Sequence, residues 1–167
     1  MGIAAVATVV AVGVVVARDR GPAAPSAKRH TGGPGLSLEG TNPVTGEAVS
    51  LARFAGKPVV VTIWASWCPG CNAEAADLKR FVEAHPEAAF LGLDFQDSRG
   101  AARGFYRRYG WSFPSIFDPE GKIAFRLGLQ GTPTTIFLDR RHREVARIVG
   151  ETDESGLADG LRRADAS

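Results

Sequence analysis

The sequence predicts an α/β protein in which a central mixed sheet carries helices on both faces. Three observations predict this class: short runs of β-branched and apolar residues, helical segments between them, and an order in which strands and helices alternate. Such an alternation forms a sheet with both faces covered. With 44% hydrophobic residues in 167, the chain holds enough apolar side chains for one such core.

The predicted strands are short runs of apolar and β-branched residues bounded by turn residues. In chain order they cover residues 36–38, 48–51, 59–64, 89–94, 115–117, 123–125, 134–138 and 144–149. The first two flank a turn-like Asn-Pro…Gly sequence at 42–46, which predicts an N-terminal β-hairpin. Residues 59–64 are mostly β-branched and residues 89–93 are apolar or glycine, as expected of central strands that are buried on both faces.

Three helices are expected between and after these strands. The first begins at Pro69, which has no N–H to leave unpaired in a first turn, and it ends before Pro86. The second begins after Ser98, whose hydroxyl can cap a helix. The third begins at Thr152 or Asp153 and occupies the C-terminus.

The N-terminal part of the chain differs from the rest. Residues 3–17 carry no charge, and this length lies just below the roughly 17–25 apolar residues of a spanning helix. We therefore expect residues 1–17 to be a membrane anchor or signal segment, and residues 18–35, rich in Gly, Pro and basic residues, to be a flexible linker. Arg18 and Arg20 come directly after the apolar run, and the positive-inside rule by itself would place the downstream domain in the cytoplasm.

The net positive charge of the chain comes from this leader. The net charge of the chain is +2, of which residues 1–34 contribute +3 and residues 35–167 contribute −1. A near-neutral domain offers no electrostatic footprint for nucleic acid, so we expect no nucleic-acid partner. The predicted domain covers residues 36–167.

The two cysteines of the chain, Cys68 and Cys71, lie in a Trp-Cys-Pro-Gly-Cys sequence between the strand 59–64 and the first helix. Helical residues three apart share a face with Cβ atoms about 5–6 Å apart, so small adjustments allow a disulfide. Cys68 lies at the helix N-terminus, where unpaired N–H groups and the helix dipole favour a thiolate. We therefore predict that the more exposed Cys68 is the nucleophile and that the deeper Cys71 resolves the mixed disulfide.

Two alternatives for the cysteine pair are weaker. An inert disulfide that closes a four-residue loop would remove little entropy from the unfolded chain. A zinc site would need two more ligands with finger-like spacing, and His30, His85 and His142 are scattered along the chain. We therefore expect a redox dithiol, with no metal and no cofactor.

The sequence around the cysteines resembles a known family. Residues 64–71 (WASWCPGC) are similar to the active-site run of the thioredoxin superfamily, closest to the membrane-anchored extracytoplasmic redoxins of the TlpA, ResA and DsbE type. Residues 113–122 (FPSIFDPEGK) resemble that group's Pro-strand-Asp-x-x-Gly-Lys segment, and residues 131–139 (GTPTTIFLD) resemble its cis-proline segment. The resemblance covers residues 36–165 and implies a thioredoxin-like fold.

The resemblance also implies residues that bind the substrate. Pro133 matches the cis proline that lies beside the cysteines in this family. The backbone of Thr132 would pair with an extended client segment, as in strand addition. Trp67, Pro69 and Gly70 would line the same site.

Glu74 matches a glutamate that tunes the cysteines in the TlpA and ResA group. The alternative is a solvated carboxylate that only complements the dipole in the first turn of the helix. The buried aspartate of thioredoxin itself has no counterpart, because Thr62 occupies that position.

These features predict an extracytoplasmic thiol–disulfide oxidoreductase, held by a single-pass N-terminal anchor, that exchanges disulfides with cysteine-containing exported proteins. The resemblance implies a reductant of the cytochrome c maturation type, with a membrane electron donor or acceptor as a second partner. Pro69-Gly70 lacks a histidine that would strongly favour the thiolate, which also favours a reductant. Two alternatives stay open: an oxidase that forms disulfides in exported proteins, and a non-enzymatic copper carrier, although the cysteine spacing is one residue short for the latter.

Overall fold

The computed structural model describes residues 1–2 and 35–167. The predicted membrane anchor and linker fall almost entirely in residues 3–34, outside the described residues. No helix of the described residues combines the length and the apolar character that crossing a bilayer requires.

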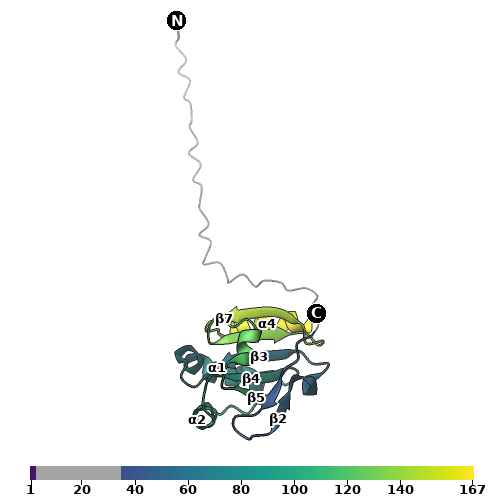
Figure 1. Ribbon diagram of the computed structural model, residues 1–167. Helices are drawn as coiled ribbons and strands as arrows, with labels where there is room; N and C mark the ends of the chain where they lie inside the picture. The colour runs from purple at the N-terminus through teal and green to yellow at the C-terminus, as the bar shows by residue number, and fades with distance from the viewer. Residues whose placement is uncertain (3–34) are drawn as a thin grey trace.

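Five strands form the central sheet in the order β5-β4-β3-β6-β7 (Figure 1). The strands are β3 (Val59–Trp64), β4 (Ala89–Phe95), β5 (Ser115–Asp118), β6 (Thr134–Leu138) and β7 (Glu144–Val149). Strands β3, β4 and β5 are parallel, whereas β6 runs antiparallel to both β3 and β7. Every residue of β3 and β4 is buried, so the predicted mixed sheet with two covered faces is confirmed.

A separate two-stranded antiparallel hairpin precedes the sheet, as predicted, but residues 36–38 are not its first strand. The Leu36 N–H donates instead to the His142 carbonyl at 2.8 Å. The hairpin consists of β1 (Glu39–Thr41) and β2 (Ala48–Ser50), and the short 3-10 helix η1 (Leu51–Phe54) comes next in the chain. Its turn is stabilised by Asn42, whose Oδ1 accepts the Val44 N–H at 2.8 Å. An Asn at the start of a turn often accepts such a hydrogen bond, which explains why the sequence signal was correct.

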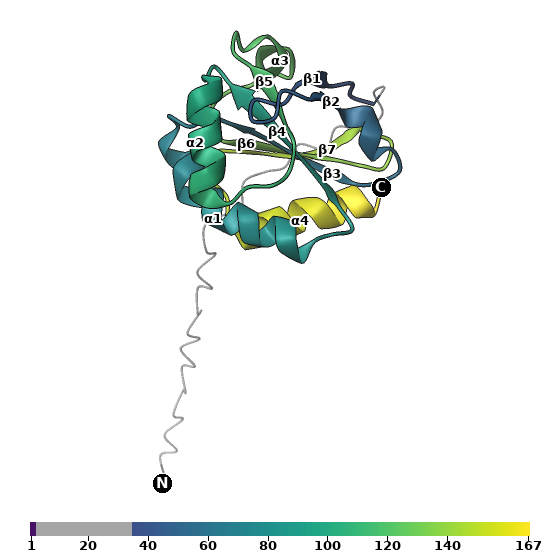
Figure 2. The same ribbon diagram turned by 90° about the horizontal axis from the view of Figure 1, so that it is seen from below.

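Helices cover both faces of the sheet (Figure 2). The helices are α1 (Pro69–Ala84), α2 (Arg99–Tyr109), α3 (Lys122–Arg126) and α4 (Glu154–Asp165). Helices α1, α2 and α4 pack on one face, and α3 packs with the hairpin on the other. The side chains of Cys68, Ser98 and Asp153 cap α1, α2 and α4, so Asp153 rather than Thr152 is the cap of the last helix.

The predicted strand at residues 123–125 is wrong, because these residues belong to helix α3. Gly121 has a φ of 71°, which turns the chain away from the direction of β5. The carboxylate of Asp118 then accepts the Ala124 N–H at 2.9 Å and stabilises the first turn of the helix. Ala124 is buried while Phe125 is 58% exposed, so the three-residue apolar run does not form one buried face.

Candidate active site

Cys68 and Cys71 form a disulfide at the N-terminus of α1, and their Cα atoms are 5.3 Å apart. Cys68 is the N-cap of the helix, and its Sγ accepts the Cys71 N–H at 3.1 Å. One N–H of the first helical turn, that of Cys71, therefore points at the sulfur that was expected to become a thiolate. The expected difference in exposure is absent, because each cysteine residue is 1% exposed in this oxidised pair.

The loop that precedes Cys68 is fastened to the loop after β4. The Ser66 N–H donates to Asp97 Oδ2 at 2.7 Å, and the Trp67 indole N–H donates to the Gln96 carbonyl at 3.1 Å. Because β3 and β4 are parallel neighbours, both loops leave the same edge of the sheet and meet there. Trp67 remains 54% exposed beside the disulfide, as a side chain that lines a client site would.

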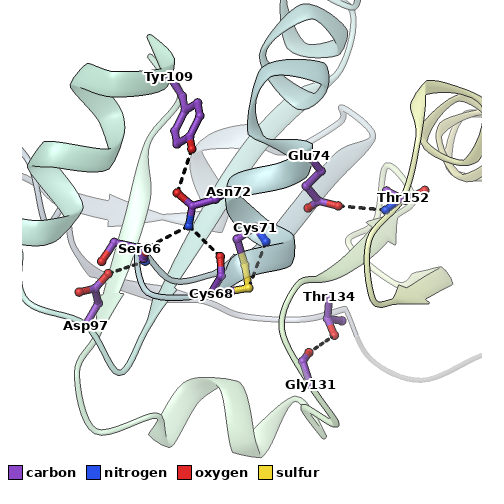
Figure 3. Close-up of a disulfide and its surroundings, with 10 residues drawn as sticks. All are labelled: Ser66, Cys68, Cys71, Asn72, Glu74, Asp97, Tyr109, Gly131, Thr134 and Thr152. Carbon is purple, nitrogen blue, oxygen red and sulfur yellow. Dashed lines mark hydrogen bonds between the residues drawn. A yellow bond between two sulfur atoms is a disulfide. The ribbon is translucent and has the colours of Figure 1, made fainter.

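Asn72, the residue after Cys71, ties this loop to the helices (Figure 3). Its Nδ2 donates to the Ser66 carbonyl at 2.9 Å and to the Cys68 carbonyl at 2.8 Å. The Tyr109 hydroxyl, at the end of α2, donates to Asn72 Oδ1 at 2.9 Å. The sequence reasoning missed both Asn72 and Tyr109, since the bond between them joins residues 37 positions apart.

The Thr132–Pro133 peptide bond is cis, as the resemblance implied. The Thr134 hydroxyl donates to the Gly131 carbonyl at 2.6 Å and so closes the turn around the proline. A Cβ added to Gly70 would lie 3.0 Å from Pro133 Cδ. Pro133 therefore lies against the backbone between the two cysteines, and the close approach favours glycine at position 70.

Glu74 lies near the first turn of α1, and the structure contradicts the alternative in which it is a solvated carboxylate. Glu74 is only 7% exposed, and its Oε2 accepts the Thr152 N–H at 3.0 Å (Figure 3). Burial raises the pKa of Glu74 to about 7; the hydrogen bond from Thr152 opposes this shift, and the nearby charges of Glu151 and Asp77 add to it. Since residues three apart share a helix face, Glu74 lies on the same side of α1 as Cys71.

A second buried carboxylate, Asp94, was not singled out in the sequence. Asp94 is fully buried in β4 opposite Trp64, and neither of its oxygens has a hydrogen-bond partner in the described part of the chain. Burial raises its pKa to about 8, with a further increase from the charge of Asp97 and an opposing effect of Arg99. The available signal was a charged residue that directly follows the apolar run of a central strand.

The described residues also show whether a metal ion could be held near the site and where the other candidate residues lie. Among them, no group of three or more His, Cys, Asp or Glu side chains is arranged to hold a metal ion. The structure brings Gly70, Pro133 and Glu74 to the disulfide, and it places Glu151, which the sequence reasoning missed, against Gly70.

This arrangement allows one kind of chemistry. A disulfide with one sulfur at a helix N-terminus, an adjacent cis proline and a buried carboxylate with a pKa near neutrality can exchange with another disulfide and move a proton. The profile of the protein family described as Redoxin matches residues 19–161. The chain belongs to the redoxin family.

This redoxin is similar to secreted and thiol-exchanging bacterial proteins. It is 35% identical over 86 residues to the soluble secreted antigen MPT53 of Mycobacterium tuberculosis. The aligned part covers 52% of this chain and 50% of that protein. It is also 35% identical over 98 residues to the thiol:disulfide interchange protein DsbE of Allochromatium vinosum, covering 56% of this chain and 54% of the relative. The matched parts thus span about half the length of these curated relatives.

The similarity extends to solved structures. The crystal structure of a DsbF homologue from Corynebacterium diphtheriae has a TM-score of 0.75 and 30% sequence identity to this redoxin, covering 86% of this chain and 96% of that one. The predicted thioredoxin-like fold and the resemblance to the DsbE group are therefore confirmed.

Proposed function

We propose that this redoxin is a thiol–disulfide oxidoreductase that acts as a reductant of exported proteins. The observation that carries the proposal is the Cys68–Cys71 disulfide at the N-terminus of α1, packed next to the cis Pro133. Family membership and the names of the relatives support the same activity. From the resemblance to the ResA and DsbE group, the client class is the cysteine pair of apocytochrome c, and a membrane donor returns the electrons.

The proposed reaction uses both cysteines in turn. In the reduced protein, the Cys68 thiolate attacks one sulfur of a client disulfide and releases the other client sulfur as a thiolate. Cys71 gives its proton to Glu74 and attacks Cys68 Sγ, which releases the second client thiolate and leaves the Cys68–Cys71 disulfide. Two electrons pass from the protein to the client, and the two client thiolates take up protons.

The carboxylate of Glu74 supports the direction of electron flow. A buried negative charge on the helix face of Cys71 opposes thiolate formation and therefore disfavours ionised forms of the reduced pair. A dithiol that is stabilised less by ionisation is a stronger reductant. The Pro69-Gly70 dipeptide between the cysteines adds no positive charge that would reverse this effect.

A second candidate function is the formation of disulfides in exported proteins. The hydrogen bond from the Cys71 N–H to Cys68 Sγ favours this alternative, because it would stabilise a Cys68 thiolate and with it the reduced pair. The oxidase would use the same residues in the opposite direction and would differ in redox potential.

The redox potential of the full chain distinguishes the two candidates. The protein is equilibrated with glutathione or dithiothreitol buffers, and the fraction of free thiols is measured by alkylation. A reductant should have a potential close to that of thioredoxin, about −270 mV, whereas a strong oxidant should lie close to about −120 mV. A potential near the upper value would contradict the reductant and favour the oxidase.

We also propose that the domain lies outside the cytoplasm, held by its N-terminal segment on the outer face of the cell membrane. The uncharged residues 3–17 support this location, and one of the relatives is described as a soluble secreted antigen. A C-terminal reporter that is active only after export should be active in cells. Activity of a cytosolic reporter in its place would mean that Arg18 and Arg20 set the opposite orientation.

A further inference from the structure

The side chain of Glu151 lies over the dipeptide that separates the two cysteines. A Cβ added to Gly70 would meet the Cγ and the Oε1 of Glu151, each at 2.8 Å. The same Cβ would lie 3.0 Å from Pro133 Cδ, so Glu151 and Pro133 approach Gly70 together. A carboxylate therefore stands at the point where the resemblance places a bound client segment.

The backbone on both sides of Glu151 is held in place. The Gly150 N–H donates to the Pro133 carbonyl at 2.8 Å, and the Thr152 N–H donates to Glu74 Oε2 at 3.0 Å. These two bonds connect the neighbours of Glu151 to the cis proline and to the buried glutamate. The side chain itself is exposed, and no ion-pair partner for it is found among the described residues.

The surroundings of Glu151 carry a negative charge. A groove of about 830 Å³ between α1, β7 and α4 is lined in part by Glu74 and Glu151, and its lining holds five acidic residues against Arg147 and Arg163. Arg147 is paired with Glu144, and two of the acidic residues, Asp77 and Asp159, are paired with Arg80 and Arg162. Glu74, Glu151 and Asp153 therefore remain against Arg163. A cation that approaches the disulfide from this side is attracted, and an anion is repelled.

We propose that Glu151 is a specificity-determining residue that pairs with a lysine or arginine next to the reactive cysteine of the client. The inference rests on the proposed exchange function and names its substrate class: exported polypeptides with a basic residue beside the disulfide. A client strand that pairs with the backbone at Thr132 carries the neighbours of its cysteine past Gly70, within reach of Glu151. Trp67 flanks the disulfide as an exposed aromatic side chain without charge.

The test uses a synthetic peptide with one internal disulfide, made in two versions that carry either lysine or glutamate on both sides of each cysteine. The reduced full-length protein reduces each peptide at low ionic strength, and the two rates are compared. The lysine peptide should react about two- to fivefold faster, which is the size expected of one exposed ion pair. The preference should shrink in high salt.

Variants separate Glu151 from the overall charge of the protein. Glu151→Gln should abolish the preference, and Glu151→Lys should reverse it. Glu39→Lys changes the net charge equally at an exposed position of β1 and should retain the preference. A change in thiol pKa would alter both rates alike, so the ratio of the two rates reports recognition.

The outcomes for the two proposals differ. Equal rates for the two peptides, or a lysine preference that survives Glu151→Lys, would overturn the inference, whatever the absolute rates of reduction are. Rates for both peptides no higher than those of free glutathione would instead count against the proposed exchange function.

Discussion

The Tyr109 hydroxyl donates a hydrogen bond to Asn72 Oδ1 at 2.9 Å and thereby sets the orientation of the Asn72 amide. The Nδ2 group then faces the carbonyls of Ser66 and Cys68 and donates to both. Because Cys68 caps α1, this network holds the peptide that directs Cys68 Sγ toward the Cys71 N–H. The end of α2 is thus connected to the backbone of Cys68 through the side chain of Asn72.

We expect Tyr109→Phe to raise the pKa of Cys68 in the reduced protein. The variant frees the Asn72 amide to turn, so the Cys71 N–H is less well aligned with the thiolate that it stabilises. The free energy of unfolding should fall by about 1 kcal/mol, the value of one hydrogen bond. The pH dependence of Cys68 alkylation and a urea titration measure the two effects.

Tyr106→Phe is the matched control for this prediction. It removes a hydroxyl that donates to the Phe113 carbonyl at 3.0 Å, on the same helix but away from Asn72. Its stability should fall by a similar amount while the alkylation curve stays in place. The same pKa change in both variants would mean that Tyr109 has only a structural role.

The two cysteines should behave unequally when a client is trapped. Cys71→Ser should accumulate a covalent mixed disulfide between Cys68 and the client, because the resolving thiol is missing. Cys68→Ser should trap little, since Cys71 lies inside the first turn of α1. Non-reducing gels followed by mass spectrometry identify the linked cysteine. Equal trapping by the two variants would refute the assignment of the nucleophile.

Glu74→Gln should lower the pKa of Cys68 and slow disulfide exchange without loss of the fold. The substitution removes a negative charge that opposes the thiolate, and it removes the group that accepts the proton of Cys71. The alkylation profile and the exchange rate measure these effects. Glu83→Gln, at an exposed position of the same helix, is the control and should leave both unchanged. Alkylation curves of Glu74→Gln and wild type that superimpose would remove Glu74 from the site.

Asp94 should make the protein less stable as the pH rises. The pKa of Asp94 is about 8 in the folded protein and ordinary in the unfolded chain, so the folded state holds more protons between these values. The stabilisation that Asp94 contributes through this pKa difference is complete below about pH 4 and is lost as the pH rises to about 8. Over this range the free energy of unfolding should fall by up to about 1.4 kcal/mol per pH unit. Asp94→Asn should flatten this dependence.

Urea denaturation between pH 5 and pH 8 tests the effect of Asp94. Glu74, with a pKa of about 7, contributes a slope of the same sign, so both single variants and the double variant are compared. Asp159→Asn, at an exposed position of α4, should leave the slope unchanged. A wild-type slope that persists in Asp94→Asn would show that the buried carboxylate is already ionised in the folded protein.

The sequence by itself determined the elements and the position of the reactive pair. The strand 59–64 and the helix that begins at Pro69 result from β-branched residues, a proline suited to a first turn and the residues that end the helix. The disulfide between Cys68 and Cys71 depends on the same local geometry, because residues three apart in a helix share a face. Local signals failed at residues 36–38, which precede the first strand of the hairpin, and at residues 123–125, where three apolar residues fit a strand and a helical turn equally well.

Only the tertiary structure decided the environment of that pair. Glu74 is a buried acid rather than a solvated carboxylate because Thr152, 78 residues later in the chain, folds over it. The contact of Glu151 with Gly70, and the bonds from Tyr109 to Asn72 and from Ser66 to Asp97, likewise join distant segments. The burial of a side chain and the charges around it depend on which strands and helices pack beside it. The residues next to it in the sequence do not determine that packing.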